Sequence, residues 1–160
     1  MFRKLAFTAA LVTAAMVSTA QAEEYKLGDL VIDTPWMKAT MPNAPVSGGY
    51  MVIRNTGSEA DRLIGGNVDF AGKVEVHEMK MENDVMKMRE VEGGLEIPAG
   101  GEVVLKPGGF HVMFMGLKEQ LKEGETREVE VSFQNAGSIT LPFPVKPVTM
   151  MKKPMAQGAN

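Results

Sequence analysis

The sequence predicts a single all-β domain, arranged as a two-sheet sandwich or barrel. Short runs rich in Val, Ile and Phe alternate with turn-forming residues, including nine prolines and five Gly-Gly pairs. No segment shows a convincing helical period of apolar residues. Many short strands at regular spacing are typical of a sandwich or barrel. A chain of 160 residues is long enough for one hydrophobic core and short for two.

The N-terminal segment has the features of a secretory signal peptide. Arg3 and Lys4 precede an apolar run over residues 5–17, and Ala20-Gln21-Ala22 has the small-x-small pattern of a cleavage site. The apolar run is too short for a membrane span. We therefore expect residues 1–22 to be a cleaved signal peptide and the protein to function in a bacterial periplasm, with a domain over residues 23–148 and a tail over residues 149–160.

Charge and cysteine content exclude several classes of function. Without Arg3 and Lys4, 15 basic and 20 acidic residues remain, which gives a net charge of −5 and makes nucleic acid and anionic membranes unsuitable partners. The chain contains no cysteine. This excludes disulfides, an acyl anchor on a lipobox cysteine, thiol redox chemistry and a blue-copper site, which needs a thiolate ligand.

Ten strands are predicted, each a β-rich run bounded by turn-forming residues. In chain order they span residues 30–38, 49–55, 61–68, 74–81, 85–91, 95–97, 102–105, 110–115, 127–134 and 138–143. Asn55-Thr56-Gly57 ends the second strand, and Glu82-Asn83-Asp84 is a turn-like connection between the fourth and the fifth. The Gly-Gly pairs are also interpreted as turns, because none begins the strand–loop–helix pattern of a phosphate-binding loop.

Alternation within two of the strands separates a core face from an unusual opposite face. In strand 127–134, Val129, Val131 and Phe133 alternate with polar residues, as in an ordinary half-buried strand. In the run Phe110-His111-Val112-Met113-Phe114-Met115, the aromatic and valine side chains form the core face, which leaves one imidazole and two thioethers on the other side. That face requires a ligand, a partner or a covering loop.

The other histidine lies in a similar pattern. His77, Met79 and Met81 share one face of strand 74–81, and Met86 and Met88 share one face of the next strand. An even-numbered loop places His77 opposite Met88 and Met79 opposite Met86, whereas an odd-numbered loop separates them onto different faces. A functional cluster requires the even loop.

Imidazole and thioether groups without any thiolate suit Cu(I) better than Zn(II), Ca(II) or Mg(II). The chain has 14 methionines, of which Met1 and Met16 lie in the predicted signal peptide. Met37, Met41 and Met51 are interpreted as gap-filling core residues. No Ser-His-Asp or HExxH arrangement is recognisable, so an enzyme is not expected.

The segment His77-x10-Met88-x22-His111-x-Met113 resembles the copper-binding signature of the PCu(A)C family of periplasmic copper chaperones. Glu75-Val76-His77-Glu78, Leu105-Lys106-Pro107-Gly108-Gly109 and Met115-Gly116-Leu117 are also similar, and the resemblance extends over about residues 28–145. It implies a cupredoxin-like Greek-key β-sandwich that binds one Cu(I) per monomer. The implied ligands are His77, Met88, His111 and Met113.

The resemblance also implies partners. Members of the family are implicated in supplying copper to the binuclear centre of cytochrome c oxidase subunit II, alongside Sco-type copper proteins. Met150, Met151 and Met155 in the tail could recruit a second copper ion weakly, although a frayed terminus explains them nearly as well. Two alternatives remain at this point: a periplasmic copper sequestration or resistance protein, and a methionine-rich protein-binding module without metal.

Overall fold

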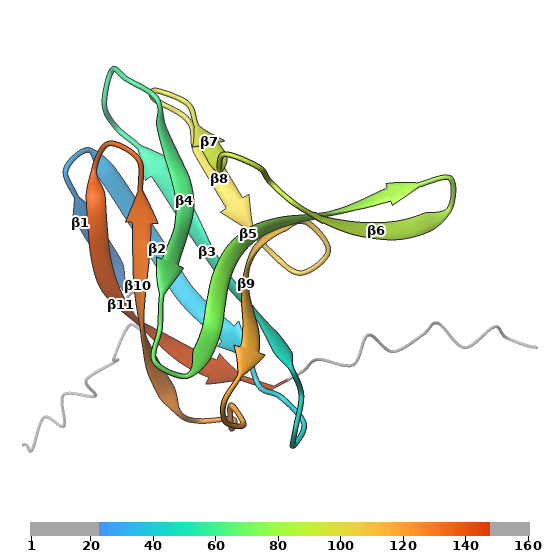
Figure 1. Ribbon diagram of the computed structural model, residues 1–160. Coiled ribbons are helices and arrows are strands. Elements are labelled where there is room, and N and C mark those ends of the chain that lie inside the picture. The colour runs from blue at the N-terminus through green and yellow to red at the C-terminus, as the bar shows by residue number, and fades with distance from the viewer. Residues whose placement is uncertain (1–22, 148–160) are drawn as a thin grey trace, which may run out of the picture.

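The computed structural model describes residues 23–147, which form eleven β-strands and no helix (Figure 1). The strands are β1 (Glu24–Leu27), β2 (Leu30–Lys38), β3 (Val46–Asn55), β4 (Asp61–Asn67), β5 (Ala71–Glu82), β6 (Val85–Glu90), β7 (Leu95–Ile97), β8 (Glu102–Leu105), β9 (Phe110–Leu117), β10 (Thr126–Phe133) and β11 (Gly137–Lys146). The predicted all-β class is confirmed. No helix long and apolar enough to cross a bilayer occurs among the described residues. The predicted signal peptide and the whole predicted tail lie outside this range.

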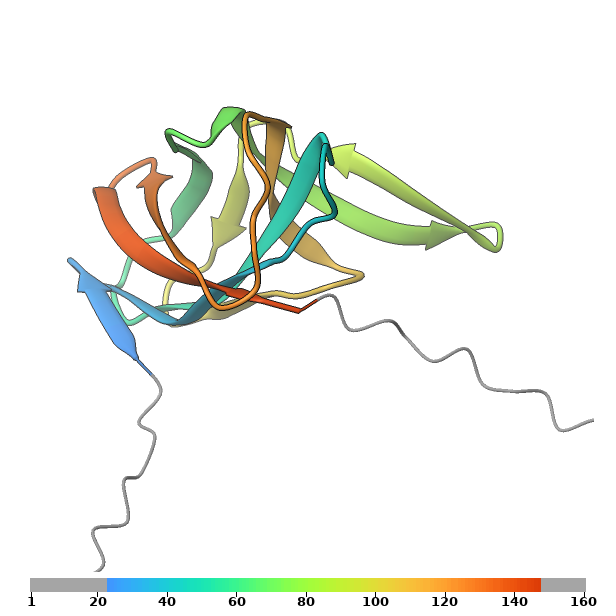
Figure 2. The ribbon, with the colours of Figure 1, turned by 90° about the horizontal axis from the view of Figure 1, so that it is seen from below.

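The strands form one continuous sheet that wraps into two layers. Its order is β6-β5-β9-β3-β2-β11-β10-β4-β7, with β1 added to β2 and β8 added to β3. The two layers are joined where β11 pairs with β2 in parallel, through Val145 and Met37. Neighbours in the sheet are often distant in the sequence, which is the connectivity of a Greek-key sandwich. Figure 2 shows the two layers curving around a common interior.

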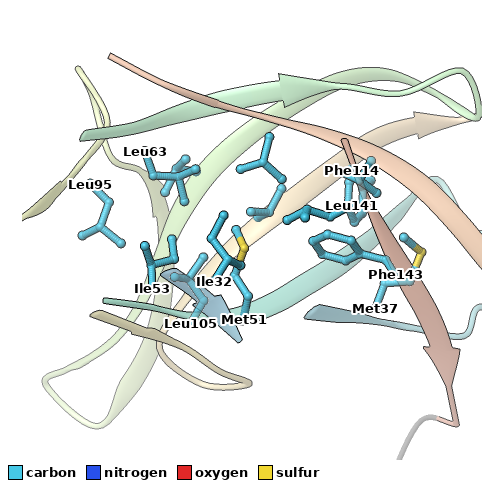
Figure 3. Close-up of a cluster of buried hydrophobic side chains, with 14 of the residues drawn as sticks. Ile32, Met37, Met51, Ile53, Leu63, Leu95, Leu105, Phe114, Leu141 and Phe143 are labelled. Atoms are coloured by element: carbon cyan, nitrogen blue, oxygen red, sulfur yellow. The ribbon is translucent and has the colours of Figure 1, made fainter. Parts of the chain in front are cut away.

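The core fills the space between the layers, as Figure 3 shows. Phe114 is fully buried in it, and its ring centroid lies 5.3 Å from that of Phe70 and 6.4 Å from that of Phe143. The predicted alternation of strand β10 is confirmed, because its Val and Phe side chains are buried and the intervening residues are not.

Met37 and Met51 are buried in the core as expected. The same expectation is wrong for Met41, which is 76 % exposed in the turn after β2.

All ten predicted strands are present, and β1 was not predicted. The polar, half-exposed edge strand β1 lacks the apolar run that marks the others. Two of the Gly-Gly pairs interpreted as turns, Gly48-Gly49 and Gly65-Gly66, lie inside strands, and the second of them also falls within the predicted strand 61–68. A Cβ at Gly49 in β3 would lie 2.9 Å from the Phe114 ring, and a Cβ at Gly66 in β4 would lie 2.1 Å from the Glu130 carbonyl oxygen. These glycines therefore permit close packing rather than chain reversal.

Strands β5 and β6 form a long hairpin whose outer half projects from the body of the molecule (Figures 1 and 2). Its turn is the pair Asn83-Asp84, both with positive φ (52° and 62°), which matches the twist of a two-residue hairpin. The even loop is confirmed, but the predicted register is wrong by two residues. Met88 lies opposite Met79, and His77 lies opposite Glu90. The turn lies one residue later than that register required, because Asn and Asp adopt left-handed backbone conformations readily.

Candidate metal centre

The two histidines are direct neighbours across strands β5 and β9. His77 pairs with His111 in the antiparallel register, so both rings project from the same face of the sheet. Their ring centroids lie 5.8 Å apart, and the ring planes are inclined by 55°. Each side chain is almost fully buried, although that face was predicted to lie opposite the core. The sequence placed each histidine on the correct face but could not bring the two strands together.

One nitrogen of each imidazole is held by a hydrogen bond. His77 Nε2 lies 2.6 Å from Glu75 Oε2, and His111 Nδ1 lies 3.1 Å from the carbonyl oxygen of Gly109. Hydrogen bonds from Lys73 and then from His77 lower the pKa of Glu75, so this carboxylate is ionised and can only accept. A carbonyl oxygen also only accepts. His77 Nε2 and His111 Nδ1 therefore donate these hydrogen bonds, and the other ring nitrogens, His77 Nδ1 and His111 Nε2, are the ones that carry a lone pair in the neutral rings.

These two lone-pair nitrogens are buried and have no hydrogen-bond partner within residues 23–147. An unsatisfied buried polar atom typically costs about 1–3 kcal/mol, so two adjacent ones require an explanation. Burial lowers the pKa of His111, which keeps its ring neutral and its Nε2 lone pair free at neutral pH. A metal ion bound by both nitrogens would satisfy them. The carboxylate and carbonyl partners then act as outer groups that orient the ligands.

Thioethers complete the site on the same face. Met113 follows His111 by two residues and is buried. Met88, from the projecting hairpin, is 45 % exposed. A cavity of about 390 Å³ is lined by Met88, His111 and Met113 together. Three of the four predicted ligands therefore surround one cavity, and the His77 ring packs beside that of His111.

Several residues around the cavity were not predicted as part of the site. Met79 and Met86 line it as well, and so does Tyr50, whose ring centroid is 6.5 Å from that of His111. Tyr50 packs on Trp36 at 4.5 Å, which gives the site an aromatic wall. The alternation of methionines in β5 and β6 was a visible signal for Met79 and Met86. Tyr50 gave no such signal, because it reaches the site only through the pairing of β3 with β9.

The chemistry of the arrangement follows from its donors. Two imidazole nitrogens in their neutral form and two thioether sulfurs would provide four uncharged, mostly soft ligands, a set that favours Cu(I). Within residues 23–147, no group of three or more His, Asp or Glu side chains is placed to hold a metal ion. Beyond the two histidines, the soft donors that line the cavity at this position are the methionines.

Solved structures similar to this one include copper-bound domains. The copper-bound PCuAC domain of PmoF2 is 26 % identical, covers 78 % of this chain and 98 % of its own, and has a TM-score of 0.68. The structure of DR1885 from Deinococcus radiodurans with Cu(I) is 28 % identical, covers 82 % of this chain and 85 % of its own, and has a TM-score of 0.56. These similarities confirm the predicted cupredoxin-like fold of PCuAC domains.

Sequence comparison assigns the family. A protein of Leifsonia xyli subsp. xyli, described as a lipoprotein, is 30 % identical over 129 residues, which are 81 % of this chain and 76 % of that protein. The profile of the LpqE-like family, also described in terms of lipoproteins, matches residues 30–145, a range that includes His77, Met88, His111 and Met113. The chain therefore belongs to the LpqE-like family.

Proposed function

We propose that this protein is a periplasmic copper chaperone that binds one Cu(I) per chain through His77, Met88, His111 and Met113. The observation that carries the proposal is the pair of buried, unpartnered lone-pair nitrogens, His77 Nδ1 and His111 Nε2, beside a thioether-lined cavity. The copper-bound state of similar PCuAC domains supports the same conclusion. The neutral ligand set favours Cu(I) over Cu(II) and over Zn(II).

The exposure of the four ligands suggests how the ion is released. His77, His111 and Met113 are buried, whereas Met88 is half-exposed on the hairpin. A recipient thiolate can therefore approach from the side of Met88 and replace the thioethers one at a time. Thiolates bind Cu(I) more strongly than thioethers, so transfer in this direction is favourable. The rigid pairing of β5 with β9 holds the imidazoles in place during the exchange.

The resemblance to PCu(A)C chaperones provides the recipient. We propose delivery to the copper centre of cytochrome c oxidase subunit II, together with Sco-type copper proteins. The relatives are described as lipoproteins, which fits an exported protein. We propose that the protein is exported to the periplasm through residues 1–22 and has neither nucleic acid nor a membrane as a partner.

The binding proposal is tested by anaerobic Cu(I) titration against a chromogenic chelator. The parent protein is compared with Met88→Leu and His111→Ala, and Met41→Leu serves as a control because Met41 is exposed in a turn outside the cavity. We expect one tightly bound ion in the parent and the control, and much weaker binding in the other two. Cu(I) at about a thousand times its Kd should stabilise the parent by roughly 4 kcal/mol. Equal behaviour of all four proteins would refute the proposal.

Delivery is distinguished from sequestration by a transfer assay. The Cu(I)-loaded protein is mixed with the copper-free soluble domain of a cytochrome c oxidase subunit II, and copper is quantified in both proteins after separation. Delivery predicts loss of copper from this protein to the recipient, whereas a sequestration protein retains it. A metal-free protein-binding module would bind a partner equally well after Met88→Leu, because leucine preserves the apolar surface.

A further inference from the structure

The outer half of the β5–β6 hairpin carries more thioethers than the proposed copper site requires. Met79 lies opposite Met88, and Met81 lies opposite Met86, so the four side chains occupy two successive rungs. All four project from the same face as His77, because residues two apart on a strand share a face. This array of Met79, Met81, Met86 and Met88, which we call the methionine ladder, continues the face of His77 outward along the hairpin. Figure 1 shows that this part of the β5–β6 hairpin projects from the body of the molecule.

Core packing does not explain the ladder. Met81 is 56 % exposed and Met86 is 46 % exposed, and every residue of β6 is exposed. Apolar side chains on a projecting two-stranded hairpin gain little from burial and leave the ribbon marginally stable. Such exposure therefore points to a function for the side chains themselves.

The opposite face of the hairpin has a separate structural role. Arg89 lies 3.5 Å from a carboxylate oxygen of Glu78 and 3.0 Å from one of Glu82, and Lys87 lies 3.3 Å from Glu82. These ion pairs connect β5 to β6 across the ribbon. The hairpin thus has one face of paired charges that supports it and one face of thioethers that is left free.

The free thioethers are close enough to share an ion. Side chains directly opposite each other on antiparallel strands have Cβ atoms about 4.5–5.5 Å apart, and methionine has three rotatable bonds with which to adjust. Met79 and Met86, which are diagonal neighbours, already line the same cavity. The backbone N–H of Met79 donates to the Gly109 carbonyl oxygen at 3.0 Å, and His111 donates to the same oxygen, so the base of the ladder is fixed to the inner site.

We propose that Met79, Met81 and Met86 form a second, outer site for a soft monovalent ion, Cu(I) or Ag(I). The assignment rests on the proposed function, because Met88 is taken by the inner ion and only three thioethers then remain. The outer site has no imidazole and is more exposed, so it binds more weakly than the inner one. In this proposal, Cu(I) binds these thioethers transiently before it enters the inner site and again after it leaves that site.

The test is an Ag(I) titration, which avoids oxidation of the ion, followed by NMR of methionine methyl groups labelled with 13C. We expect two Ag(I) per chain, with the methyl signals of Met81 and Met86 shifting mainly during the second equivalent. Met81→Leu should weaken the second equivalent at least tenfold and leave the first unchanged. The double variant Met81→Leu/Met86→Leu should lose the second equivalent. Met41→Leu, which removes an exposed thioether elsewhere, should retain both.

Other outcomes separate the outer site from its alternatives. Binding of only one Ag(I) by the parent overturns the outer site and leaves the inner one standing. The outer site is also overturned if the triple variant Met150→Leu/Met151→Leu/Met155→Leu loses the second equivalent, because that result assigns the second ion to the C-terminal methionines. A first equivalent that survives His111→Ala would instead refute the proposed inner site.

Discussion

Glu75 lies between a lysine and a histidine on strand β5, and its charge acts on the metal site through His77. It accepts a hydrogen bond from His77 Nε2 at 2.6 Å and pairs with Lys73. A carboxylate in this position fixes the tautomer and the orientation of a metal-binding imidazole. The sequence showed Glu75 as a polar residue on the histidine face, but only the rotamers reveal the contact.

We expect Glu75→Gln to lower Cu(I) affinity by about tenfold or more, since removing such an outer partner typically costs 10–100-fold in metal affinity. The amide can still accept a hydrogen bond from His77, so the fold should be retained. Chelator competition measures the affinity, and Glu130→Gln on β10 is the matched control because Glu130 is exposed outside the cavity. Unchanged affinity in Glu75→Gln would show that its charge does not act on the site.

The buried ring of His111 makes the stability of the metal-free protein depend on pH. Burial lowers the pKa of His111 below the usual value of 6.5, and the hydrogen bond to the Gly109 carbonyl oxygen opposes this shift only in part. The unfolded chain therefore takes up this proton at a higher pH than the folded protein. Stability is complete above about pH 6.5 and is lost as the pH falls toward the folded-state pKa.

For one proton, the slope reaches at most about 1.4 kcal/mol per pH unit. Urea unfolding of the metal-free protein between about pH 5 and pH 7.5 measures this slope, and His111→Leu should reduce it. The mechanism is contradicted if the parent and the variant lose stability in parallel over this range.

For individual strands, the alternation of apolar and polar residues predicted which side chains share a face, but the sequence did not predict which residues of β5 and β6 lie opposite each other. The sequence identified the correct faces of β5, β6 and β9, because side chains alternate with a fixed period of two. It misplaced the β5–β6 register by two residues, since several turn residues occur together at Glu82-Asn83-Asp84 and their backbone angles decide which pair forms the turn. That register matters because it determines how far Met88 lies from His77.

The turn itself provides a test of the hairpin as a ligand carrier. Asp84 has a φ of 62°, a conformation that a β-branched residue adopts at a cost of about 1–3 kcal/mol. Because β6 is exposed throughout, Asp84→Val should loosen the hairpin without unfolding the core. We expect faster amide hydrogen exchange in β6 and weaker Cu(I) binding through displaced Met88, whereas Asp84→Gly should preserve both. Binding at parental affinity by the valine variant would show that the hairpin does not position Met88.

For the molecule as a whole, the core was more predictable than the sheet order. Runs such as the alternating Val and Phe residues of β10 defined the interior directly. The pairings of β5 with β9 and of β9 with β3, which assemble the site, connect segments separated by long intervals in the sequence. Local patterns carry little information about such contacts. The Gly-Gly pair in β3 was wrongly interpreted as a turn for this reason. The side chains that require glycine there, Phe114 and Tyr50, are packed against it only in the folded protein.

Adjacent glycines of β3 serve the two faces of the sandwich, which predicts opposite effects for two similar substitutions. A Cβ at Gly49 would lie 2.9 Å from the Phe114 ring and 3.2 Å from Phe143. Gly49→Ala therefore overpacks the core and should lower the free energy of unfolding by about 1–3 kcal/mol. A Cβ at Gly48 would instead lie 2.6 Å from the Tyr50 hydroxyl, the outer end of a side chain that can shift.

Gly48→Ala should therefore cost less stability than Gly49→Ala but should move the Tyr50 ring, whose centroid is 6.5 Å from that of His111. We expect weaker Cu(I) binding in Gly48→Ala, and near-parental affinity in the folded fraction of Gly49→Ala. Denaturant unfolding and chelator competition on both variants measure the two quantities independently. A loss of stability and of affinity in the same proportion in both variants would mean that the two faces are not separable, and that the site depends on the core as a single unit.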